Sequence, residues 1–508
     1  LFNTYLQLLV VRMQIIKNTK SICPECKKVL DATISEKDGK VYIKKECPEH
    51  GSFRELYWSD YEQYQRAKGL EYIGTGMRNP RTSVKNGCPY DCGICPQHKS
   101  HTALAIIDVT NRCNLRCPVC FATAGTTGYV YEPTKEEIRG MLINLRRNEP
   151  VPATALQFSG GEPTIRRDLF ELVKMAKELG FRHLEVNTNG LRLAQSVDFC
   201  RGLKESGVST VYLQFDGMTP DVYKFTRGVD LIDVKKKAIE NCREAGMDSI
   251  VLVVTLVKGV NDHQLGDIIK FAIQNFDVVR CVNVQPVSIC GRVPERDREH
   301  IRITIPDFMK LIEKQTGGKI KATDFYPVPT VVPIARAVGA LKNKQYVEFT
   351  AHPHCGMATY IFLEDGEIVP ITHYGNVDKF VETMGKVYEE TEKGHDVRVK
   401  MYLIGSLRHI KFVMLRKYIW PLLKTGSYDT LGDLHRKMLM ISAMHFMDPY
   451  NFDLERVQRC CIHYAIPDGR IIPFCTMNSI HREGIEKELG IPVEEWREKF
   501  KSEIGAIV

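Results

Sequence analysis

Three cysteines in the stretch "TNRCNLRCPVCFA", residues 110 to 122, have the spacing of a metal-binding loop. Cys113, Cys117 and Cys120 form a C-x3-C-x2-C pattern, and cysteine thiolates bind iron-sulfur clusters and many zinc ions. A structural zinc would normally bring a fourth Cys or His at C-x2-C spacing. A four-iron cluster held by three thiolates would instead keep one iron open for a substrate or cofactor. The position of the group directly after a β-rich run favours this cluster.

A second group of cysteines upstream, "CPYDCGIC", repeats the same spacing. Cys88, Cys92 and Cys95 predict an auxiliary iron-sulfur cluster, and a single zinc ion is the alternative. No strand follows this group directly, so we expect it to pack against the domain that holds the first group. Its fourth ligand stays open among His98, His101 and Cys290.

A third pattern lies near the N-terminus, where "CPEC" and "CPEH" form C-x2-C-x20-C-x2-H. Two such knuckles typically hold one metal ion in a tetrahedron. Considered alone, these ligand types favour zinc over iron. The predicted mononuclear site consists of Cys23, Cys26 and Cys47, with His50 or a cysteine from elsewhere in the chain as the fourth ligand.

Two segments in the last third of the chain, residues 354 to 372 and 460 to 475, resemble each other. Each has a β-rich run, an Asp-Gly turn and a second β-rich run, which predicts a hairpin. Pairing of the two hairpins would bring their thiols together in a third cluster, and ordinary buried cysteines are the alternative. These thiols belong to Cys355, Cys460, Cys461 and Cys475. The isolated Cys200, Cys242 and Cys281 are expected in the core.

A series of β-rich runs that alternate with helical patterns must position the first cysteine group. Strands that are each followed by a helix imply a parallel sheet, whose carboxyl edge carries the chemistry in barrel folds. We therefore predict an α/β fold with a partial, TIM-like (β/α)6 barrel, and a flat doubly wound sheet is the alternative. The runs cover residues 104 to 110, 155 to 161, 183 to 190, 211 to 217, 250 to 257 and 281 to 288.

The composition divides the chain into four expected regions. Residues 1 to 72 would form the mononuclear metal domain and residues 73 to 102 the auxiliary-cluster segment. Residues 103 to 300 would form the barrel, and residues 301 to 508 a C-terminal α+β domain for a further cluster and the substrate.

The totals of the 508-residue chain describe a globular protein with 44% hydrophobic residues and a net charge of +8. No run approaches the ~18 apolar residues of a membrane span, and the apolar N-terminus lacks the features of a secretory signal. We expect a cytoplasmic protein, with Met13 as a candidate start. Residues 398 to 428 contain no acidic residue and form a basic amphipathic stretch. It would suit peripheral contact with the inner face of an anionic membrane, or a helix packed on the barrel.

With these motifs the chain resembles radical S-adenosylmethionine (SAM) enzymes. The C-x3-C-x2-C group and "SGGEP" at residues 159 to 163 carry the likeness. It implies that SAM chelates the open iron of a [4Fe-4S] cluster and that its reductive cleavage gives a 5′-deoxyadenosyl radical. It also implies a catalytic role for the first cysteine group and an electron donor such as a ferredoxin. The residues expected to contact SAM are Gly160, Gly161, Glu162, Asn187, Asn189, Gln214, Asp216 and Gln285.

The overall layout is similar to the archaeal tetraether lipid synthases, from about residue 20 to 480. This likeness implies that two archaeal diether phospholipids are joined at their terminal methyl carbons, and that the N-terminal site holds a rubredoxin-like iron. It also implies two auxiliary clusters. Unactivated methyl groups offer nothing for acid-base catalysis, so we expect a long apolar tunnel for the lipid tails.

Two alternatives remain from the same residues. Some members of this family are pterin methylases, so 7,8-dihydro-6-hydroxymethylpterin is an alternative substrate for the same radical chemistry. A protein of another class, a zinc-knuckle nucleic-acid-binding protein, would use the positive charge to bind phosphates. We expect no nucleic-acid partner, because that class leaves Glu162 and the six strand ends without a purpose.

Overall fold

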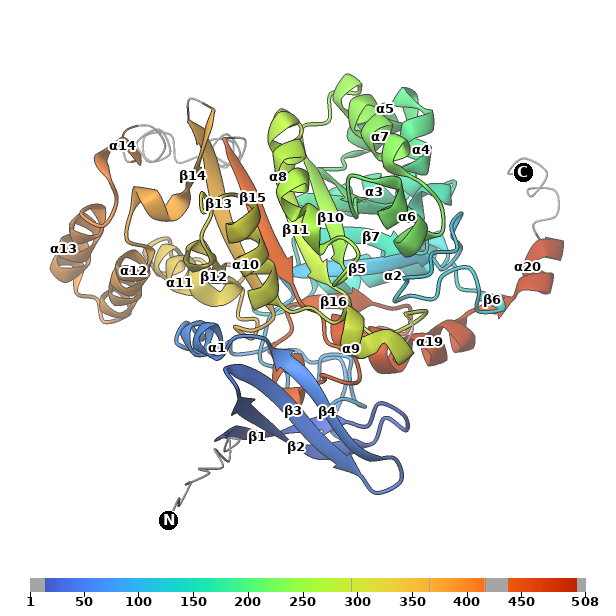
Figure 1. Ribbon diagram of the computed structural model, residues 1–508, viewed down its shortest axis with the longest axis horizontal. Helices are drawn as coiled ribbons and strands as arrows, with labels where there is room; N and C mark the ends of the chain where they lie inside the picture. Colours follow the sequence, from blue (N-terminus) through green and yellow to red (C-terminus); the bar gives the residue numbers. More distant parts are fainter. Residues whose placement is uncertain (1–13, 294, 365, 415, 417–436, 500–508) are drawn as a thin grey trace, which may run out of the picture.

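A computed structural model describes residues 14–293, 295–364, 366–414, 416 and 437–499 of the chain. A small four-stranded sheet at the N-terminus lies against a large curved sheet of twelve strands, and helices cover the outside of the large sheet (Figure 1). This arrangement agrees with the predicted α/β barrel that carries an N-terminal metal-knuckle domain.

The N-terminal sheet is an antiparallel meander in the order β1-β2-β3-β4. The turn between β2 and β3 is the Asp38-Gly39 pair, and both residues have a positive φ (55° and 72°), as a tight two-residue hairpin turn requires. Helix α1 follows, and Asp60 caps its first turn by accepting a hydrogen bond from the Gln63 N–H. The elements are β1 (Gln14–Ile22), β2 (Val29–Lys37), β3 (Lys40–Cys47), β4 (Gly51–Trp58) and α1 (Tyr61–Lys68).

The centre of the large sheet consists of six parallel strands at the six predicted positions. Their side chains alternate, and the outward set, which includes Leu156, Phe158, Val186 and Leu213, is fully buried under the helices. The prediction of six successive β/α units is confirmed. The strands are β5 (Leu104–Thr110), β7 (Ala155–Gly160), β8 (His183–Thr188), β9 (Thr210–Gln214), β10 (Ile250–Leu256) and β11 (Val279–Pro286).

The helices of these units present one apolar stripe to the sheet. In α3 the buried residues Leu169, Leu172, Val173 and Ala176 recur at helical spacing, so one face packs inward and the other stays in solvent. The covering helices are α2 (Lys135–Arg146), α3 (Leu169–Glu178), α4 (Leu191–Gln195), α5 (Val197–Ser206), α6 (Pro220–Arg227), α7 (Ile232–Glu244) and α8 (Leu265–Gln274).

Strands from the last third of the chain extend this sheet at both edges. β15 pairs with β11 in parallel, and β13 pairs antiparallel with β15; at the other edge β16 pairs with β5. Both predicted hairpins exist, as β13-β14 and β16-β17. Their predicted pairing with each other is wrong, because each satisfies a different open edge of the barrel sheet. The added strands are β12 (Tyr326–Pro327), β13 (Gly356–Glu364), β14 (Glu367–Pro370), β15 (Met438–Met444), β16 (Ile462–Ala465) and β17 (Ile471–Pro473).

The remaining helices lie beyond the barrel edges. Residues after 301 contribute strands to the same sheet as the barrel. The four expected region boundaries stay predictions. These helices are α9 (Arg298–Ile301), α10 (Ile305–Gln315), α11 (Val332–Leu341), α12 (Val377–Glu392), α13 (Asp396–Leu407), α14 (Phe412–Met414), α17 (Leu454–Val457), α18 (Phe474–Thr476), α19 (Arg482–Leu489) and α20 (Val493–Lys499). A short pair of strands, β6 (Tyr129–Val130) and β18 (Ile491–Pro492), joins α20 to the barrel side.

The basic stretch from 398 to 428 falls partly on α13 and partly on residues 417–436, which lie outside the described residues. On α13 the apolar side chains of Val397, Met401 and Ile404 are exposed, at 66 to 74% of their full area. Within the described part of the chain, no helix is long and apolar enough to cross a bilayer. Contact with a membrane surface stays a prediction.

A buried ionic network joins the N-terminal sheet to the rest of the protein. Arg302 donates two hydrogen bonds to Asp448 (2.9 and 3.2 Å) and its Nε lies 3.0 Å from Glu55 of β4. Tyr57 of β4 donates to Asp453 at 2.9 Å. Because Arg302 and Asp448 are almost fully buried, each charge depends on the other for compensation.

Replacing Arg302 with Met should lower the free energy of unfolding by roughly 3 to 5 kcal/mol, because the buried Asp448 would lose its charged partner and keep only hydrogen bonds from backbone N–H groups. The matched control is Arg243→Met, which breaks an ion pair with Asp277 whose side chains are 37% and 54% exposed and should cost below about 1 kcal/mol. Anaerobic denaturant unfolding of both variants measures the difference. Equal losses would contradict the structural role of the buried network.

Candidate functional site

The first cysteine group follows β5 at the carboxyl edge of the parallel strands. Burial raises the pKa of the Cys113 thiol to about 12, and the nearby Glu162 carboxylate adds to this effect. Burial also raises the pKa of Cys117. Thiols bind metals as thiolates. Because burial disfavours the thiolates of Cys113 and Cys117, they need a positively charged metal centre beside them. The three thiols fit a metal cluster for this reason.

The separation of these thiols distinguishes a cluster from a single ion. Among the described residues, the first cysteine group is not one of the sets whose ligand atoms all lie within 4.8 Å of one another. A tetrahedral ion with bonds of about 2.3 Å keeps neighbouring sulfur ligands only about 3.8 Å apart. The wider spacing of Cys113, Cys117 and Cys120 fits a cubane, whose thiolates bind different irons.

Gly160 and Gly161, at the end of β7, allow this strand end to pack closely against the cysteine loop. A Cβ atom on Gly160 or Gly161 would lie 2.1 Å from the carbonyl oxygens of Thr110 and Arg112 respectively, so only glycine fits at either position. The backbone N–H groups of Gly161 and Glu162 donate to these same two carbonyls (2.7 and 2.9 Å). The "GGE" turn is therefore joined directly to the cysteine loop.

The Glu162 carboxylate lies between three loops. It is 1% exposed, and burial raises its pKa. Its Oε1 accepts from the backbone and hydroxyl of Thr164 and from the Thr188 hydroxyl, while its Oε2 accepts the N–H of Asn189 at 2.7 Å. Oε1 has no remaining lone pair, so a cofactor amine could bind only at Oε2. Asn189 is held in turn by Asn114, whose amide oxygen accepts from it at 2.7 Å.

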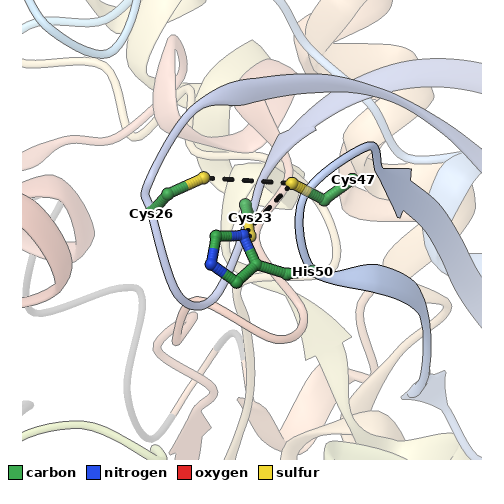
Figure 2. A group of neighbouring side chains, drawn as sticks. All are labelled: Cys23, Cys26, Cys47 and His50. Carbon is green, nitrogen blue, oxygen red and sulfur yellow. Dashed lines mark hydrogen bonds between the residues drawn. The ribbon is translucent and has the colours of Figure 1, made fainter.

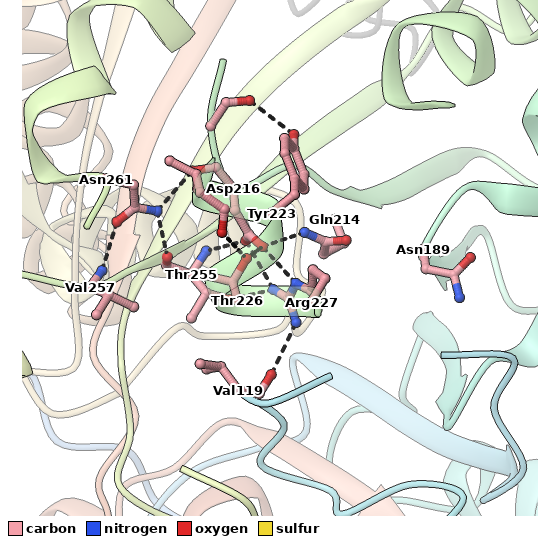
Figure 3. Close-up of polar contacts among 12 residues, drawn as sticks. Val119, Asn189, Gln214, Asp216, Tyr223, Thr226, Arg227, Thr255, Val257 and Asn261 are labelled. Carbon is pink, nitrogen blue, oxygen red and sulfur yellow. Dashed lines mark hydrogen bonds and ion pairs between the residues drawn. The ribbon is translucent and has the colours of Figure 1, made fainter. Parts of the chain in front are cut away.

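Asp216, after β9, is saturated by protein contacts (Figure 3). Its carboxylate accepts from Arg227 (2.6 and 2.9 Å), Gln214 (2.5 Å) and the Thr226 hydroxyl (2.8 Å), and from the backbone N–H of Thr255 (3.1 Å). Because its side chain is fully buried, Asp216 positions its neighbours in this structure. The predicted contact of Asp216 with SAM stays a prediction.

Arg227 joins that carboxylate to the cysteine loop. Burial opposes its charge, yet Asp216 raises the pKa of Arg227 above its usual value. Its Nη1 donates to the Val119 carbonyl at 3.2 Å, and its guanidinium also contacts the Cys117 thiol. The residue ends α6 just before Gly228, and no spacing rule in the sequence indicates this contact.

Lys235 is a second cation that the sequence did not indicate. It is fully buried, and its Nζ donates to the Gln214 side chain at 2.7 Å and to the Asn189 carbonyl. Burial, and then the charge of Arg227, lower the pKa of Lys235 to about 7. Lys235 therefore ties together the ends of β8 and β9, where two of the predicted contact residues lie. The predicted Asn187 and Gln285 lie on the inner face of the same sheet.

The second cysteine group lines a small cavity. Cys88, Cys92 and Cys95 border it together with His98 and the segment around Val457. Of the three candidates for a fourth ligand, His98 alone borders this cavity among the described residues, and its Nε2 is engaged by the Cys460 carbonyl (2.8 Å).

His481 is a ligand candidate that the sequence did not indicate for the second group. It contacts the Cys92 thiol, and its Nε2 lies 3.0 Å from the Pro89 carbonyl. A ring nitrogen held by a carbonyl is the usual arrangement of a metal-binding histidine. Nothing in the spacing of "CPYDCGIC" predicts this neighbour, which comes from the far end of the chain.

The four C-terminal thiols also come together, although their hairpins do not pair. Cys461 and Cys475 each lie near enough to Cys355 for its negative charge to raise their pKa further, after burial. The buried Arg456 contacts Cys355 and supplies positive charge. The curvature of the sheet brings its two edges close enough for this contact (Figure 1). Cys200, Cys242 and Cys281 are buried, as expected for core residues.

An aromatic contact joins the segments next to these two groups. Phe121 follows Cys120, Phe474 precedes Cys475, and their ring centroids are 5.7 Å apart. Phe446 stacks on Phe474 at 3.9 Å. Phe474 and Cys475 belong to one small apolar cluster, and Phe121 packs against it.

The N-terminal ligand set has the geometry of a single-ion site (Figure 2). Cys26 and Cys47 are 3.9 Å apart, and the Nδ1 of His50 lies 3.7 Å from Cys23 and 3.4 Å from Cys47. These values match the edge of about 3.8 Å expected for a tetrahedral metal. The hydrogen bond from His50 lowers the pKa of Cys47 to about 6, so one thiolate is already favoured near neutral pH.

Comparisons with known proteins identify the family. The model described as the Radical SAM superfamily matches residues 107–272, and the HMPTM N-terminal zinc ribbon domain matches residues 15–59. A curated relative, the 7,8-dihydro-6-hydroxymethylpterin dimethyltransferase of Methanocaldococcus jannaschii, is 51% identical over 96% of this chain and 98% of its own length. This chain belongs to the radical SAM superfamily. SAM and a [4Fe-4S] cluster are therefore its cofactors.

Other relatives of this radical SAM protein match the barrel region. A probable GTP 3′,8-cyclase of Methanothermobacter marburgensis is 30% identical over 39% of this chain and 62% of its own length. The crystal structure of SuiB from Streptococcus suis with SAM covers 43% of this chain and 48% of its own, at 19% identity and a TM-score of 0.35.

The predicted substrate is corrected by these relatives. The expected resemblance to tetraether lipid synthases, and the coupling of lipid methyl groups that it implied, are wrong, because a full-length relative is a pterin methyltransferase. The motifs that suggested the lipid enzymes are those expected to bind the cofactors, and enzymes with different substrates share the same cofactors.

Replacing Cys26 with Ser should remove a single metal ion per chain, because the N-terminal set would lose one of its four ligands. Elemental analysis of anaerobically purified protein measures zinc and iron together and identifies the ion that is lost. Cys281→Ser is the control, since that buried thiol lies outside the cysteine groups. Unchanged metal content in the Cys26 variant would contradict a mononuclear site here.

Proposed function

We propose that this radical SAM protein is a methyltransferase that acts on 7,8-dihydro-6-hydroxymethylpterin. The observation that carries the proposal is the 51% identity to the M. jannaschii enzyme along nearly the whole of both chains. Similarity that extends over the N-terminal sheet, the barrel and the C-terminal cysteines includes the parts that differ most between members of the superfamily.

The inner face of the barrel supports a polar substrate. Where a lipid tail would need apolar walls, the inward positions carry residues such as Gln157, Glu185, Tyr212 and Asn283. Burying unpaired polar groups against hydrocarbon is costly, whereas a heterocycle rich in N–H and C=O groups can pair with them.

The cofactor site follows from the residues at the strand ends. We assign Cys113, Cys117 and Cys120 to the SAM-binding cluster, which, when bound, supplies one-electron cleavage of SAM to a 5′-deoxyadenosyl radical. Glu162 lies near Cys113, and its Oε2, which accepts one hydrogen bond from Asn189, can accept another from an amine. Arg227, which is held by Asp216, contacts the loop and brings positive charge to it.

The other cysteine groups extend the proposal. We assign auxiliary [4Fe-4S] clusters to the group from Cys88 to Cys95 and to the four C-terminal thiols, with an acidic electron carrier such as a ferredoxin as the donor. Cys88 and Cys95 are partly exposed. The exposed residues Lys85 and Lys99 flank their loop in the sequence. The exchange of electrons with a donor would be easiest on this side.

Anaerobic incubation with SAM, a strong reductant and 7,8-dihydro-6-hydroxymethylpterin should give pterin-dependent 5′-deoxyadenosine, and deuterium from a labelled pterin should appear in it. Cell extract that supplies a one-carbon donor should then yield pterin with one and two added methyl groups. Mass spectrometry measures both products. Absence of pterin-dependent cleavage in protein with full iron content would refute the proposed substrate.

Replacing Cys117 with Ala should abolish SAM cleavage, by at least about a hundredfold, because the cluster would lose one of its three ligands. The same assay for 5′-deoxyadenosine measures the loss, and Cys242→Ala serves as the matched control for removing a buried thiol. Full activity of the Cys117 variant would contradict this ligand assignment.

A further inference from the structure

The inner face of strands β7, β8, β9 and β11 carries a connected set of polar side chains. Strand register places Gln157 beside Glu185, and Asn187 beside Tyr212. Since successive side chains alternate, these residues point away from the helices, whose side of the sheet is apolar apart from strand-end residues such as Thr188. Glu185 and Tyr212 are partly exposed, so protein side chains do not fully cover them.

Glu185 retains hydrogen-bonding capacity on this face. Its Oε2 accepts from the Gln157 amide at 2.8 Å and its Oε1 lies 2.9 Å from the Nε2 of His183. A carboxylate offers about four acceptor sites, so each oxygen can accept one more hydrogen bond. On β5, Asp108 pairs with the buried Arg482 through its Oδ2 (2.6 Å), whereas its Oδ1 is buried without a hydrogen-bond partner among the described residues.

Tyr212 is held as a donor. Its phenol oxygen accepts from the side-chain amides of Asn283 and, at 3.0 Å, Gln285. Asn283 is itself fixed by the Ser442 hydroxyl, which donates to its amide oxygen at 3.1 Å. With both lone pairs engaged, the phenol hydrogen finds no acceptor among the described residues. Burial and the charge of Glu185 raise the pKa of Tyr212, so the phenol stays protonated.

We propose that Glu185 and Tyr212 bind the 2-amino-4-oxopyrimidine edge of the pterin. That edge presents two donors, the 2-amino group and N3–H, followed by one acceptor, the 4-oxo oxygen. Glu185 accepts from the two donors and Tyr212 donates to the 4-oxo oxygen. This inference rests on the proposed function and adds the residues that determine its substrate.

The position of Glu185 along its strand sets the direction of the ligand. Glu185 lies four residues before Asn189 at the carboxyl edge, a distance of about 13 Å in an extended strand. A bicyclic ring whose pyrimidine edge rests on Glu185 would extend its other ring and its hydroxymethyl arm toward the cysteine loop. The reacting carbons would then face the cofactor, and the recognition edge would lie deep in the barrel.

Binding of two fluorescent ligands, 6-hydroxymethylpterin and 6-hydroxymethyllumazine, to the full cluster-loaded chain tests the assignment. Lumazine carries a 2-oxo group in place of the 2-amino group and would direct an oxygen at the Glu185 carboxylate. The wild-type protein should bind the pterin at least about tenfold more tightly. Failure to bind either ligand would overturn the proposed function and this inference with it.

Two variants separate the roles of the two side chains. Glu185→Gln should weaken pterin binding by about tenfold to a hundredfold and remove the preference over lumazine. Tyr212→Phe should weaken both ligands about equally, by several fold, because both carry the 4-oxo group. Glu171→Gln, a change on the exposed surface of α3, should alter neither affinity.

Iron content and circular dichroism establish that each variant is folded. A folded Glu185→Gln protein that keeps the wild-type preference for the pterin would overturn the assignment while leaving the proposed function intact. Should that variant fail to fold, Tyr212→Phe decides alone, since unchanged affinity for both ligands overturns the inference equally.

Discussion

The compensation of buried negative charge is the constraint on which the active edge of this protein depends. Three thiols, Glu162 and Asp216 lie within one region of low exposure. Isolated charges cannot remain ionised there without partners, because desolvation favours the neutral form. Arg227 and Lys235 supply positive charge from the protein, and a metal cluster supplies the rest.

That constraint explains why the two cations have so many contacts. Arg227 donates hydrogen bonds to both Asp216 and the cysteine loop, so one side chain joins the end of β9 to that loop. Lys235 performs the same task for the ends of β8 and β9. A radical reaction requires the reacting atoms to be held closely, and a network of charged hydrogen bonds is stiffer than apolar packing alone.

One sheet serves two purposes because its side chains alternate. The outward set packs under the helices and supplies the hydrophobic free energy of the barrel, whereas the inward set of β7 and β8 carries polar residues such as Gln157 and Glu185. The metal groups divide in a similar way. The N-terminal ligands have the spacing of a single-ion site, whereas the first cysteine group is not, among the described residues, one of the sets whose ligand atoms all lie within 4.8 Å of one another.

The sequence by itself determined the local features of this protein. Ligands that share one loop, such as Cys113, Cys117 and Cys120, are recognisable because their spacing is itself the geometry of the site. The six strands and the two Asp-Gly hairpins in the last third of the chain were readable for the same reason, since period and turn chemistry are properties of neighbouring residues. Superfamily and cofactors follow from those short patterns, whereas the substrate does not.

Only the tertiary structure decided which distant residues meet. Arg227, Lys235 and His481 carry no local signal, because their partners are brought to them by the order of strands and by the closing of the sheet. The polar alternation in "HLEVNT" was visible in the sequence, but which side of β8 faces inward depends on where the helices pack. The residues that we propose for substrate recognition come from several strands. Because the short cofactor motifs carry no information about them, the sequence suggested a lipid substrate.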